Sequence, residues 1–542
     1  MMRASEFLCS GWKMMVMRSI GCWNGCYYAA SGWWIFSKQR GGRSRTCLPT
    51  GGELTLIALL CTTAALAQVP RVWDERAMAT LELPLVKPEY SAKHASAEAY
   101  YKIPVIEVYK SHPVYRPDHE PPNYLAFLQG QAPEFEWDPA KLPKTQTEWI
   151  RAGEALFDAP TRIGRIAYGE VDINDPYVHQ RDWYEAVKPA IGGDGVLPGI
   201  RWVIRRKGKL EIGVNACSMC HSRVMPDGFI TAGPGGQFTY DAAVAEDIRK
   251  AGKSAVMIEQ NRQLLRRMYF TPWSPHTEAF EKLAAFDHQQ MAVLLDGHTG
   301  GVMSIDRAAP WAPVKVPDLI GVADRKYLGA TGLVQQRSIE DLMRFIALHQ
   351  GGDSLTTFGE WAPPVAKDIG PRFSDEQVYA LAQFLYSLKP PKNPYKPNSF
   401  TRKGRAVFER EGCAACHSGV SLTNNKLMPA PGFRVPEAHL KLYDIEPVSI
   451  GTDPALALET RRGTGYYRVP SLNGLWYRGP FGHNGSVVEL EHWFTPQRLT
   501  PEFFPAGFGG LSGPQGAVKG HEYGLHLNGQ DMGALLAYLR TL

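Results

Sequence analysis

The chain has 542 residues, of which 44% are hydrophobic and 21% are charged, so it is long enough for several folded domains and is neither disordered nor fibrous. Lys and Arg number 59 and Asp and Glu 54, and the net charge of +5 is too small to indicate a nucleic-acid partner. No apolar run reaches the roughly 20 residues that span a bilayer, so we expect no transmembrane segment.

The first 67 residues are typical of a targeting segment. Residues 51–67 contain the apolar run Leu54–Leu66 behind an Arg-rich flank, and they end in the small-residue triplet Ala65-Leu66-Ala67. This layout predicts a secretory signal peptide cleaved after Ala67, and therefore a periplasmic protein; a short buried helix is the alternative. The apolar residues of 1–50 show no regular spacing, and we interpret this segment as an extension that results from a misassigned translation start.

Residues 68–144 carry many Pro and aromatic residues and no chemical motif, and we predict an arm that wraps around the rest of the chain. Helices are then expected at Thr145–Phe157, at Ser374–Leu388 and at Lys403–Arg410. Ser374 is a suitable N-cap for the second of these, and Pro390 follows its end.

Two short motifs carry the chemistry of the chain. In each, two cysteines separated by two residues are followed at once by a histidine, as Cys217, Cys220 and His221 in CSMCH and Cys413, Cys416 and His417 in CAACH. This is the attachment pattern of c-type haem, in which two thiols bind the porphyrin covalently and the histidine ligates the iron. A zinc site or a redox dithiol is the competing interpretation, but neither requires a histidine after each pair.

An internal repeat accompanies the motifs. The pattern G-x-x-x-F precedes both haem motifs, at Gly153 and at Gly404, and V-P-x-L-x-G follows both. The spacing places about 55 extra residues before the first motif and about 43 after it. We therefore predict a mainly α fold with two cytochrome-c-like haem domains and long Pro/Gly-rich loops. The first domain, 145–392, is enlarged by insertions, and the second, 393–542, is compact.

The two motifs, together with RVPSLNGLWYRGPFGHNGSVVELEHWF, resemble the bacterial di-haem cytochrome c peroxidase superfamily. Its relatives include the di-haem enzyme that matures methylamine dehydrogenase and the di-haem rubber oxygenases. The resemblance implies that the first haem is catalytic and that the second relays electrons. It also allows one calcium ion, at the carbonyl groups of Arg478 and Pro480.

The resemblance points to His483 as a residue that contacts haem 2, either by a hydrogen bond to a propionate or as a ligand. The methionine that the family places fourteen residues later is Gln497 here. Something else must bind there, or the site is open. The rubber oxygenases use a histidine nearer the C-terminus, and His521 is placed like it, so the resemblance implies His521 as the sixth ligand of the second iron, with Met428 and Met532 as rivals. The repeat aligns Lys367 with His521 and Ala330 with His483, which leaves the first iron with His221 alone.

Further residues have weaker support. One of His276, His288 and His298, after the first motif, could act as an acid or base in the pocket. Trp273 and Trp311 could relay electrons, although packing is the simpler interpretation of each.

The leading hypothesis is a periplasmic di-haem oxidoreductase that reduces hydrogen peroxide at haem 1, with electrons relayed through haem 2. Its partner would be a small redox donor such as a mono-haem cytochrome c or a cupredoxin, and a homodimer is among the assemblies considered. The alternatives are cleavage of an apolar substrate with dioxygen, and a di-haem electron carrier without enzymatic activity.

Overall fold

The structure is a computed structural model that describes residues 69–164, 177–251, 271–275, 277–304, 309, 311–350, 355–359, 370–503, 509–510, 513–514 and 518–542. The signal peptide and the extension before it lie outside the described residues, and so do His276 and Lys367. Val69–Leu542 form one unit. Within it, the boundary between the two haem domains stays a prediction. No helix of the described part is long and apolar enough to cross a membrane.

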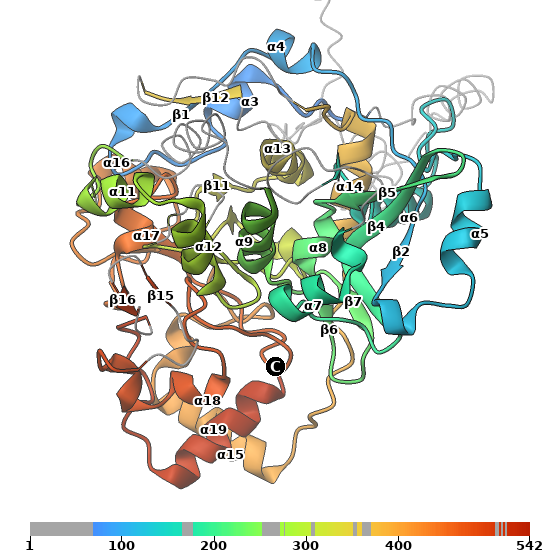
Figure 1. Ribbon diagram of the computed structural model, residues 1–542. Coiled ribbons are helices and arrows are strands. Elements are labelled where there is room, and N and C mark those ends of the chain that lie inside the picture. The colour runs from blue at the N-terminus through green and yellow to red at the C-terminus, as the bar shows by residue number, and fades with distance from the viewer. Residues whose placement is uncertain are drawn as a thin grey trace, which may run out of the picture. The chain divides into compact units, whose positions relative to one another are not determined.

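Helices make up most of the regular structure (Figure 1). Those before the second haem motif are α3 (Glu75–Ala79), α4 (Ala97–Tyr101), α5 (Tyr124–Gly130), α6 (Gln146–Phe157), α7 (Arg181–Val187), α8 (Cys217–His221), α9 (Tyr240–Ala251), α11 (Thr277–Ala284), α12 (His288–Asp296), α13 (Ile339–His349), α14 (Asp375–Ser387) and α15 (Ser399–Arg410). Those after it are α16 (Glu437–Leu442), α17 (Ala455–Leu458), α18 (Leu490–Trp493) and α19 (Gly529–Arg540).

The three predicted helices are present. Thr145 and Ser374 cap α6 and α14, each in a capping box in which side chain and backbone satisfy one another's free groups. The third helix, α15, begins earlier than predicted, because Asn398 caps it through the backbone N–H groups of Phe400 and Thr401.

The two halves of the repeat form the same helix crossing. Gly153 of α6 lies against α14, and Gly404 of α15 lies against α19. A Cβ at either glycine would overlap a backbone carbonyl oxygen, that of Ala380 or that of Ala534. The predicted G-x-x-x-F repeat therefore marks two close helix contacts of equal geometry, one beside each haem motif. In Figure 1, α15 and α19 lie side by side next to α18.

The strands are short, apart from one sheet that the sequence did not lead us to expect. They are β1 (Ala92–His94), β2 (Ser111–Tyr115), β3 (Arg162–Ile163), β4 (Val196–Arg206), β5 (Lys209–Val214), β6 (Ser222–Val224), β7 (Ile230–Ala232), β8 (Val302–Met303), β9 (Val314–Lys315), β10 (Tyr327–Leu328), β11 (Val334–Gln335), β12 (Thr356–Phe358), β13 (Leu427–Pro429), β14 (Tyr466–Arg468), β15 (Gly509–Gly510) and β16 (Gly513–Pro514). Four of them form an antiparallel sheet in the order β2-β4-β5-β3, and the other described strands pair in twos.

The four-stranded sheet lies largely within the insertion that precedes the first haem motif. Its buried face, with Leu197, Ile200 and Trp202 of β4, packs against Trp183 of α7 and Val244 of α9. The prediction of a mainly α fold is thus confirmed in its coarse form, since the structure is mostly helical with small sheets.

The segment 69–144 packs against both halves of the repeat. Val72 and Trp73 are buried in the core that contains α6 and α14. Further along, Leu83 joins a second cluster with Leu427 and Tyr466, which follow the second haem motif. The arm therefore connects the two cores through apolar burial, the main favourable term in folding.

Candidate haem sites

The first attachment motif is held by the sheet. It forms the short helix α8, which begins three residues after β5 ends. Gly199 of β4 has a φ of 71°, and a Cβ there would overlap the backbone of Met219. Only a glycine permits this approach, so β4 supports the motif from behind. Neither Cys217 nor Cys220 takes part in a disulfide bond.

The orientation of the His221 ring suits a metal ligand. Its Nδ1 lies 3.1 Å from the carbonyl oxygen of Pro317. A carbonyl can only accept, so Nδ1 carries the proton and Nε2 carries the lone pair. Burial and, to a smaller extent, the nearby His349 lower the pKa of His221 to about 4. The ring is therefore neutral at physiological pH, which is the form that binds a metal.

The second motif has the same arrangement on a different local structure. Gly412, with a φ of 79°, leads into a 3-10 turn at Cys413–Ala415. The Nδ1 of His417 lies 3.3 Å from the carbonyl oxygen of Leu422, so its Nε2 is again the lone-pair nitrogen. Burial lowers the pKa of His417 as well.

The predicted ligand His521 faces His417. Their ring centroids are 6.3 Å apart. Two imidazole nitrogens that share one metal ion lie about 4 Å apart at bond lengths of about 2 Å, with the ring centroids further back. The observed separation therefore leaves room for one iron between the rings. Burial, together with His417, lowers the pKa of His521 to about 4, so both rings are neutral.

The loop that carries His521 is fixed by a residue that sequence reasoning missed. Arg498 is fully buried and donates hydrogen bonds to the carbonyl oxygens of Val518, Gly520 and His521. A charged residue in an amphipathic turn gives no sequence signal of this role. Trp493 Nε1 also donates to His521 Nδ1 at 3.3 Å. Because Nδ1 accepts in this long hydrogen bond, the proton of the neutral ring is on Nε2. Before Nε2 can ligate a metal, the hydrogen bond must break and the proton must move to Nδ1.

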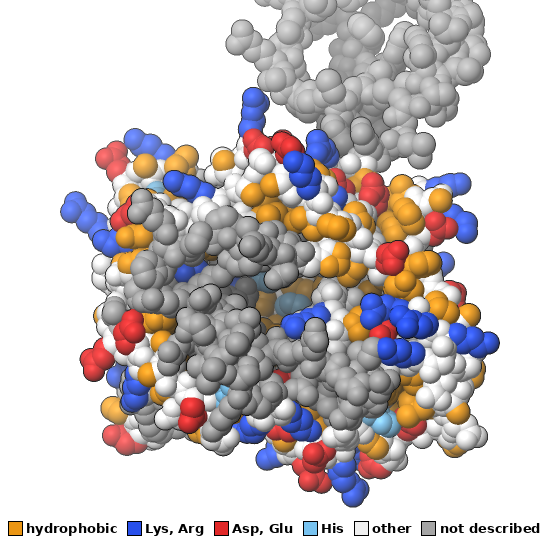
Figure 2. Space-filling view, turned by 45° about the horizontal axis from the view of Figure 1, so that its top comes forward, with side chains coloured by type: hydrophobic (Ala, Val, Ile, Leu, Met, Phe, Trp, Pro, Cys, Tyr) orange, Lys and Arg blue, Asp and Glu red, His pale blue; other side chains and the backbone are white. Residues whose placement is uncertain are grey.

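Both motifs line one cavity of 1690 Å³. Figure 2 shows a hollow with hydrophobic and histidine side chains on its floor. Among the predicted ligands, His221, His417, His483, His521 and Met428 line this cavity. Met532 instead packs in the core between α15 and α19, which removes it as a rival of His521.

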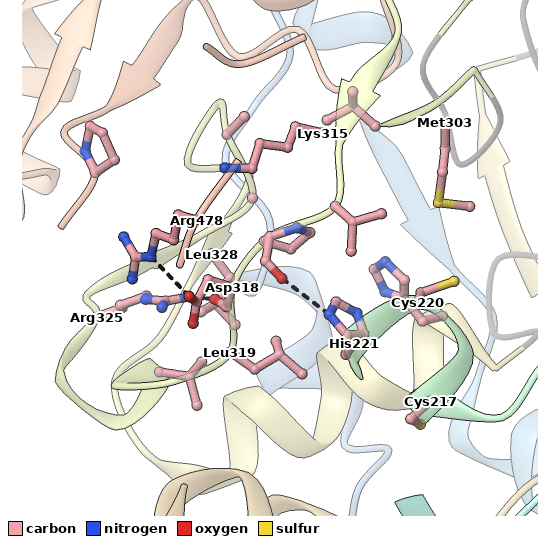
Figure 3. A pocket seen from close by; sticks show the side chains of 18 of the residues that line it. Cys217, Cys220, His221, Met303, Lys315, Asp318, Leu319, Arg325, Leu328 and Arg478 are labelled. Atoms are coloured by element: carbon pink, nitrogen blue, oxygen red, sulfur yellow. Dashed lines mark hydrogen bonds and ion pairs between the residues drawn. The ribbon is translucent and has the colours of Figure 1, made fainter. Parts of the chain in front are cut away.

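A cluster of buried cations lies between the two motifs, and it tests whether haem fits the cavity. The cluster consists of Lys315, Arg325, Arg468 and Arg478, which line the cavity, and the adjacent Arg223. Among the described residues, the buried carboxylate that faces them is Asp318, which accepts a hydrogen bond from Arg478 Nε at 2.8 Å. Figure 3 shows Lys315, Arg325 and Arg478 grouped around Asp318, beside His221.

The cation cluster calls for anionic ligands. Among the described residues of this cluster, basic side chains outnumber the one carboxylate, Asp318, and haem would bring carboxylates in its propionate groups. Burial, with Arg325 and Arg478, lowers the pKa of Arg468 to about 9. Within the described part of the chain, Arg468 Nη1 has no hydrogen-bond partner. Unpaired buried charge is costly, so the site fits groups that bring carboxylates into the cavity.

The same cluster disfavours the calcium ion that the resemblance allows. Arg223 Nη1 donates to the carbonyl oxygen of Gly479 at 2.9 Å, between the two carbonyl groups expected to bind calcium. A divalent cation there would add to an existing excess of positive charge. The described residues also contain no group of three or more His, Cys, Asp or Glu side chains placed to hold a metal ion.

His483 stacks on Tyr467, with ring centroids 4.5 Å apart. The Tyr467 hydroxyl donates to the carbonyl oxygen of Asp453 at 2.6 Å and lies 3.3 Å from His483 Nε2. Because the hydroxyl proton is donated to the carbonyl oxygen of Asp453, the hydroxyl oxygen accepts the hydrogen bond from Nε2–H of His483. Burial lowers the pKa of His483 to about 3, so the ring is neutral. Its contact with a propionate stays a prediction; Nδ1 of this tautomer is an acceptor, so a hydrogen bond to a carboxylate would require the proton to move from Nε2 to Nδ1.

The weaker candidates lie away from the cavity. His298 is buried and pairs with Asp241, with 2.6 Å between Nδ1 and Oδ2. His288 begins α12 and does not line the cavity. Trp273 Nε1 donates to the carbonyl oxygen of Leu458, and Trp311 packs in an apolar cluster, so packing accounts for both tryptophans.

One cavity residue was missed by the comparison of the repeats. His349, the last residue of α13, lines the cavity on the side of the first motif and lowers the pKa of His221. At the repeat offset its position in the second half holds Glu502 or Phe503, so the repeat could not reveal it. A helical pattern was available as a signal, because Leu342, Phe345, Ile346 and His349 share one face of α13.

No family model and no curated protein matches this chain. Among solved structures, hydrazine synthase of Kuenenia stuttgartiensis, pressurised with xenon, overlaps 55% of this chain and 92% of its own, at 14% identity and a TM-score of 0.29. A MauG-like protein associated with microbial copper homeostasis overlaps 52% of this chain and 88% of its own, at 20% identity and a TM-score of 0.27. The chemistry of the site rests on the residues described above.

Proposed function

We propose that this chain is a periplasmic di-haem c-type oxidoreductase of the peroxidase type. Hydrogen peroxide would be reduced at the first haem, with electrons passed through the second from a small one-electron donor such as a mono-haem cytochrome c or a cupredoxin. The observation that carries the proposal is one cavity lined by both CxxCH motifs and by a cluster of basic side chains.

Different residues would hold each of the two haems. Cys217 and Cys220 would tether the first, and Cys413 and Cys416 the second, in each case with the following histidine as ligand. The haem irons, when bound, supply the redox chemistry. The cation cluster would hold the propionates of both haems at one place and so fix the two groups relative to each other.

Proton supply also falls to residues of the cavity. Reduction of one peroxide to two waters consumes two electrons and two protons. Burial lowers the pKa of Lys315 to about 7, and the neighbouring Arg478 and Arg223 lower it while Asp318 raises it. Its Nζ lines the cavity and would exchange a proton near neutral pH as long as no propionate pairs with it.

Intact-mass measurement of the secreted protein tests the cofactors. We expect a chain that begins near Gln68 and carries two covalent haems, and the double variant Cys217→Ala, Cys220→Ala should carry one. Steady-state peroxide consumption with a reduced mono-haem cytochrome tests the activity, which the double variant should lack. A protein with fewer than two haems, or with two haems and no peroxide reduction, would contradict the proposal. In the second case, oxidation of an alkene by dioxygen would point to oxygenase chemistry instead.

A further inference from the structure

The V-P-x-L-x-G segments that follow the two haem motifs are closed by the same hydrogen bond in both halves. The repeat aligns Asp318 with Ser471 in position x, and it aligns Arg325 with Arg478 further along. Arg325 Nη1 donates to the carbonyl oxygen of Asp318 at 2.5 Å. Arg478 Nη1 donates to the carbonyl oxygen of Ser471 at 2.7 Å. The two segments are therefore equivalent loops, each held by its own arginine.

The side chain in position x supports the turn of its own segment. Asp318 Oδ1 accepts from the backbone N–H of Ile320 at 2.7 Å. Ser471 Oγ accepts from the backbone N–H of Asn473 at 3.1 Å. Aspartate and serine both form such turns, so a short polar side chain is enough for the local structure. The negative charge of Asp318 is therefore not required by the turn that it supports.

The segments also orient the motif histidines. His221 Nδ1 donates to the carbonyl oxygen of Pro317 at 3.1 Å. In the second half, burial lowers the pKa of His417, while hydrogen bonds to the carbonyl groups of Leu422 and Pro470 raise it. In both halves, position x thus directly follows a proline whose carbonyl group holds a motif histidine. A charge in position x acts close to the iron that this histidine would bind.

The two halves differ in the charge at position x. Asp318 Oδ2 accepts from Arg478 Nε at 2.8 Å, which is an ion pair between the two halves. The side chains of Asp318 and Arg478 are only 7% and 11% exposed, so water screens these charges weakly. Ser471, in the equivalent position, carries no charge. Arg478 therefore holds both segments, the first through its Nε and the second through its Nη1 (Figure 3).

A buried charge of this kind changes the midpoint potential of a haem. Ferric haem carries one more positive charge than ferrous haem, so a nearby carboxylate stabilises the ferric form and lowers the potential. A nearby guanidinium raises the potential for the same reason. Asp318 belongs to the first segment alone, and its effect falls mainly on the first haem. Arg478 contacts both segments, so its opposite effect is shared between the two haems.

We propose that the charge of Asp318 selectively lowers the potential of the haem held by His221, and that Arg478 is a positioning residue shared by both segments. The inference rests on the proposed function for the presence of the two haems. It assigns the electrical difference between two otherwise equivalent loops to one side chain. At equilibrium, this difference favours the haem held by His417 as the place where an electron resides.

Spectroelectrochemical titration of the full-length holoprotein, with two haems verified by mass, tests the proposal. Asp318→Asn should raise one of the two midpoint potentials more than the other, whereas Asp318→Glu keeps the charge and should stay close to the wild type. Ser471→Asp is the mirror substitution, because the repeat would place its carboxylate beside Arg325. It should lower the potential that Asp318→Asn moves least. Arg478→Gln should lower both potentials.

Asp324→Asn is the matched control, because it removes an exposed carboxylate six residues further along the chain and should move neither potential. The proposal is overturned if Asp318→Asn has no larger effect than this control, or if Arg478→Gln moves one potential alone. Ser471→Asp decides the matter even if Asp318→Asn folds poorly, because failure to lower a potential also overturns the proposal. The titrations contain no peroxide. The expected shifts without peroxide reduction would contradict the proposed function alone, and unchanged potentials in an active peroxidase would contradict this inference alone.

Discussion

The glycine at the second helix crossing offers a sharp test of the repeated core. A Cβ on Gly404 would overlap the carbonyl oxygen of Ala534 and lie 2.7 Å from the Cβ of Tyr538. Because the obstacle is backbone, no change of rotamer relieves it, and α15 must move away from α19. Overpacking of this kind costs about 1–3 kcal/mol, against about 1 kcal/mol gained when alanine replaces glycine in a helix. We expect Gly404→Ala to lose up to about 2 kcal/mol of stability.

Gly533 supplies the matched control within the same pair of helices. It lies in α19, and the nearest atom to an added Cβ is Phe400 Cζ at 3.7 Å, an ordinary contact. Gly533→Ala should therefore raise the melting temperature, while Gly404→Ala lowers it by a few degrees and Gly153→Ala does the same at the equivalent crossing. Thermal unfolding of the holoprotein, followed by circular dichroism, measures all three. The reasoning is refuted if Gly404→Ala is as stable as Gly533→Ala.

Three further predictions concern the cavity. Arg468→Leu removes one buried positive charge near the expected propionates. A haem midpoint potential should therefore fall by on the order of tens of millivolts in a spectroelectrochemical titration. Unchanged potentials would show that Arg468 does not lie near a haem. Dialysis against a calcium chelator should leave both haem spectra and the melting temperature unchanged. A spectral change would instead indicate that the protein binds calcium. Since burial holds the pKa of His483 near 3, below the value of about 6.5 in the unfolded chain, the unfolded state alone binds a proton between these values, and stability falls as the pH drops from 6.5 towards 3. His483→Gln should make the melting temperature depend less on pH between 7 and 4, and an equal slope in both proteins would argue against a buried neutral ring.

The parts of the fold that local chemistry determines were predictable. Thr145 and Ser374 show their capping roles in the sequence, and the G-x-x-x-F pattern marks both helix crossings, because only glycine permits such close contact. The two haem motifs were equally plain, since thiol and imidazole groups must stand at a fixed spacing to attach a porphyrin. These features depend on neighbours in the sequence and on little else.

The parts that depend on distant contacts were not predictable. The sheet β2-β4-β5-β3 joins strands from the arm and from the insertion, and its alternation is hidden because much of β4 is buried on both faces. Arg498 stabilises the His521 loop through carbonyl groups that are twenty or more residues away. His349 was overlooked because comparison of the repeats detects only residues of the same kind at equal positions.

The contact between Gly199 and Met219 bears on the order in which the protein is made. In the folded chain, β4 covers the back of the first motif, and burial raises the pKa of the Cys217 thiol to about 11. The thiol is then protonated at neutral pH and a poor nucleophile. On the proposed function, attachment of the porphyrin would precede the packing of β4 onto α8, while the thiol is still exposed. A variant in which β4 packs before attachment would then carry less haem, even though its folded structure could hold the group.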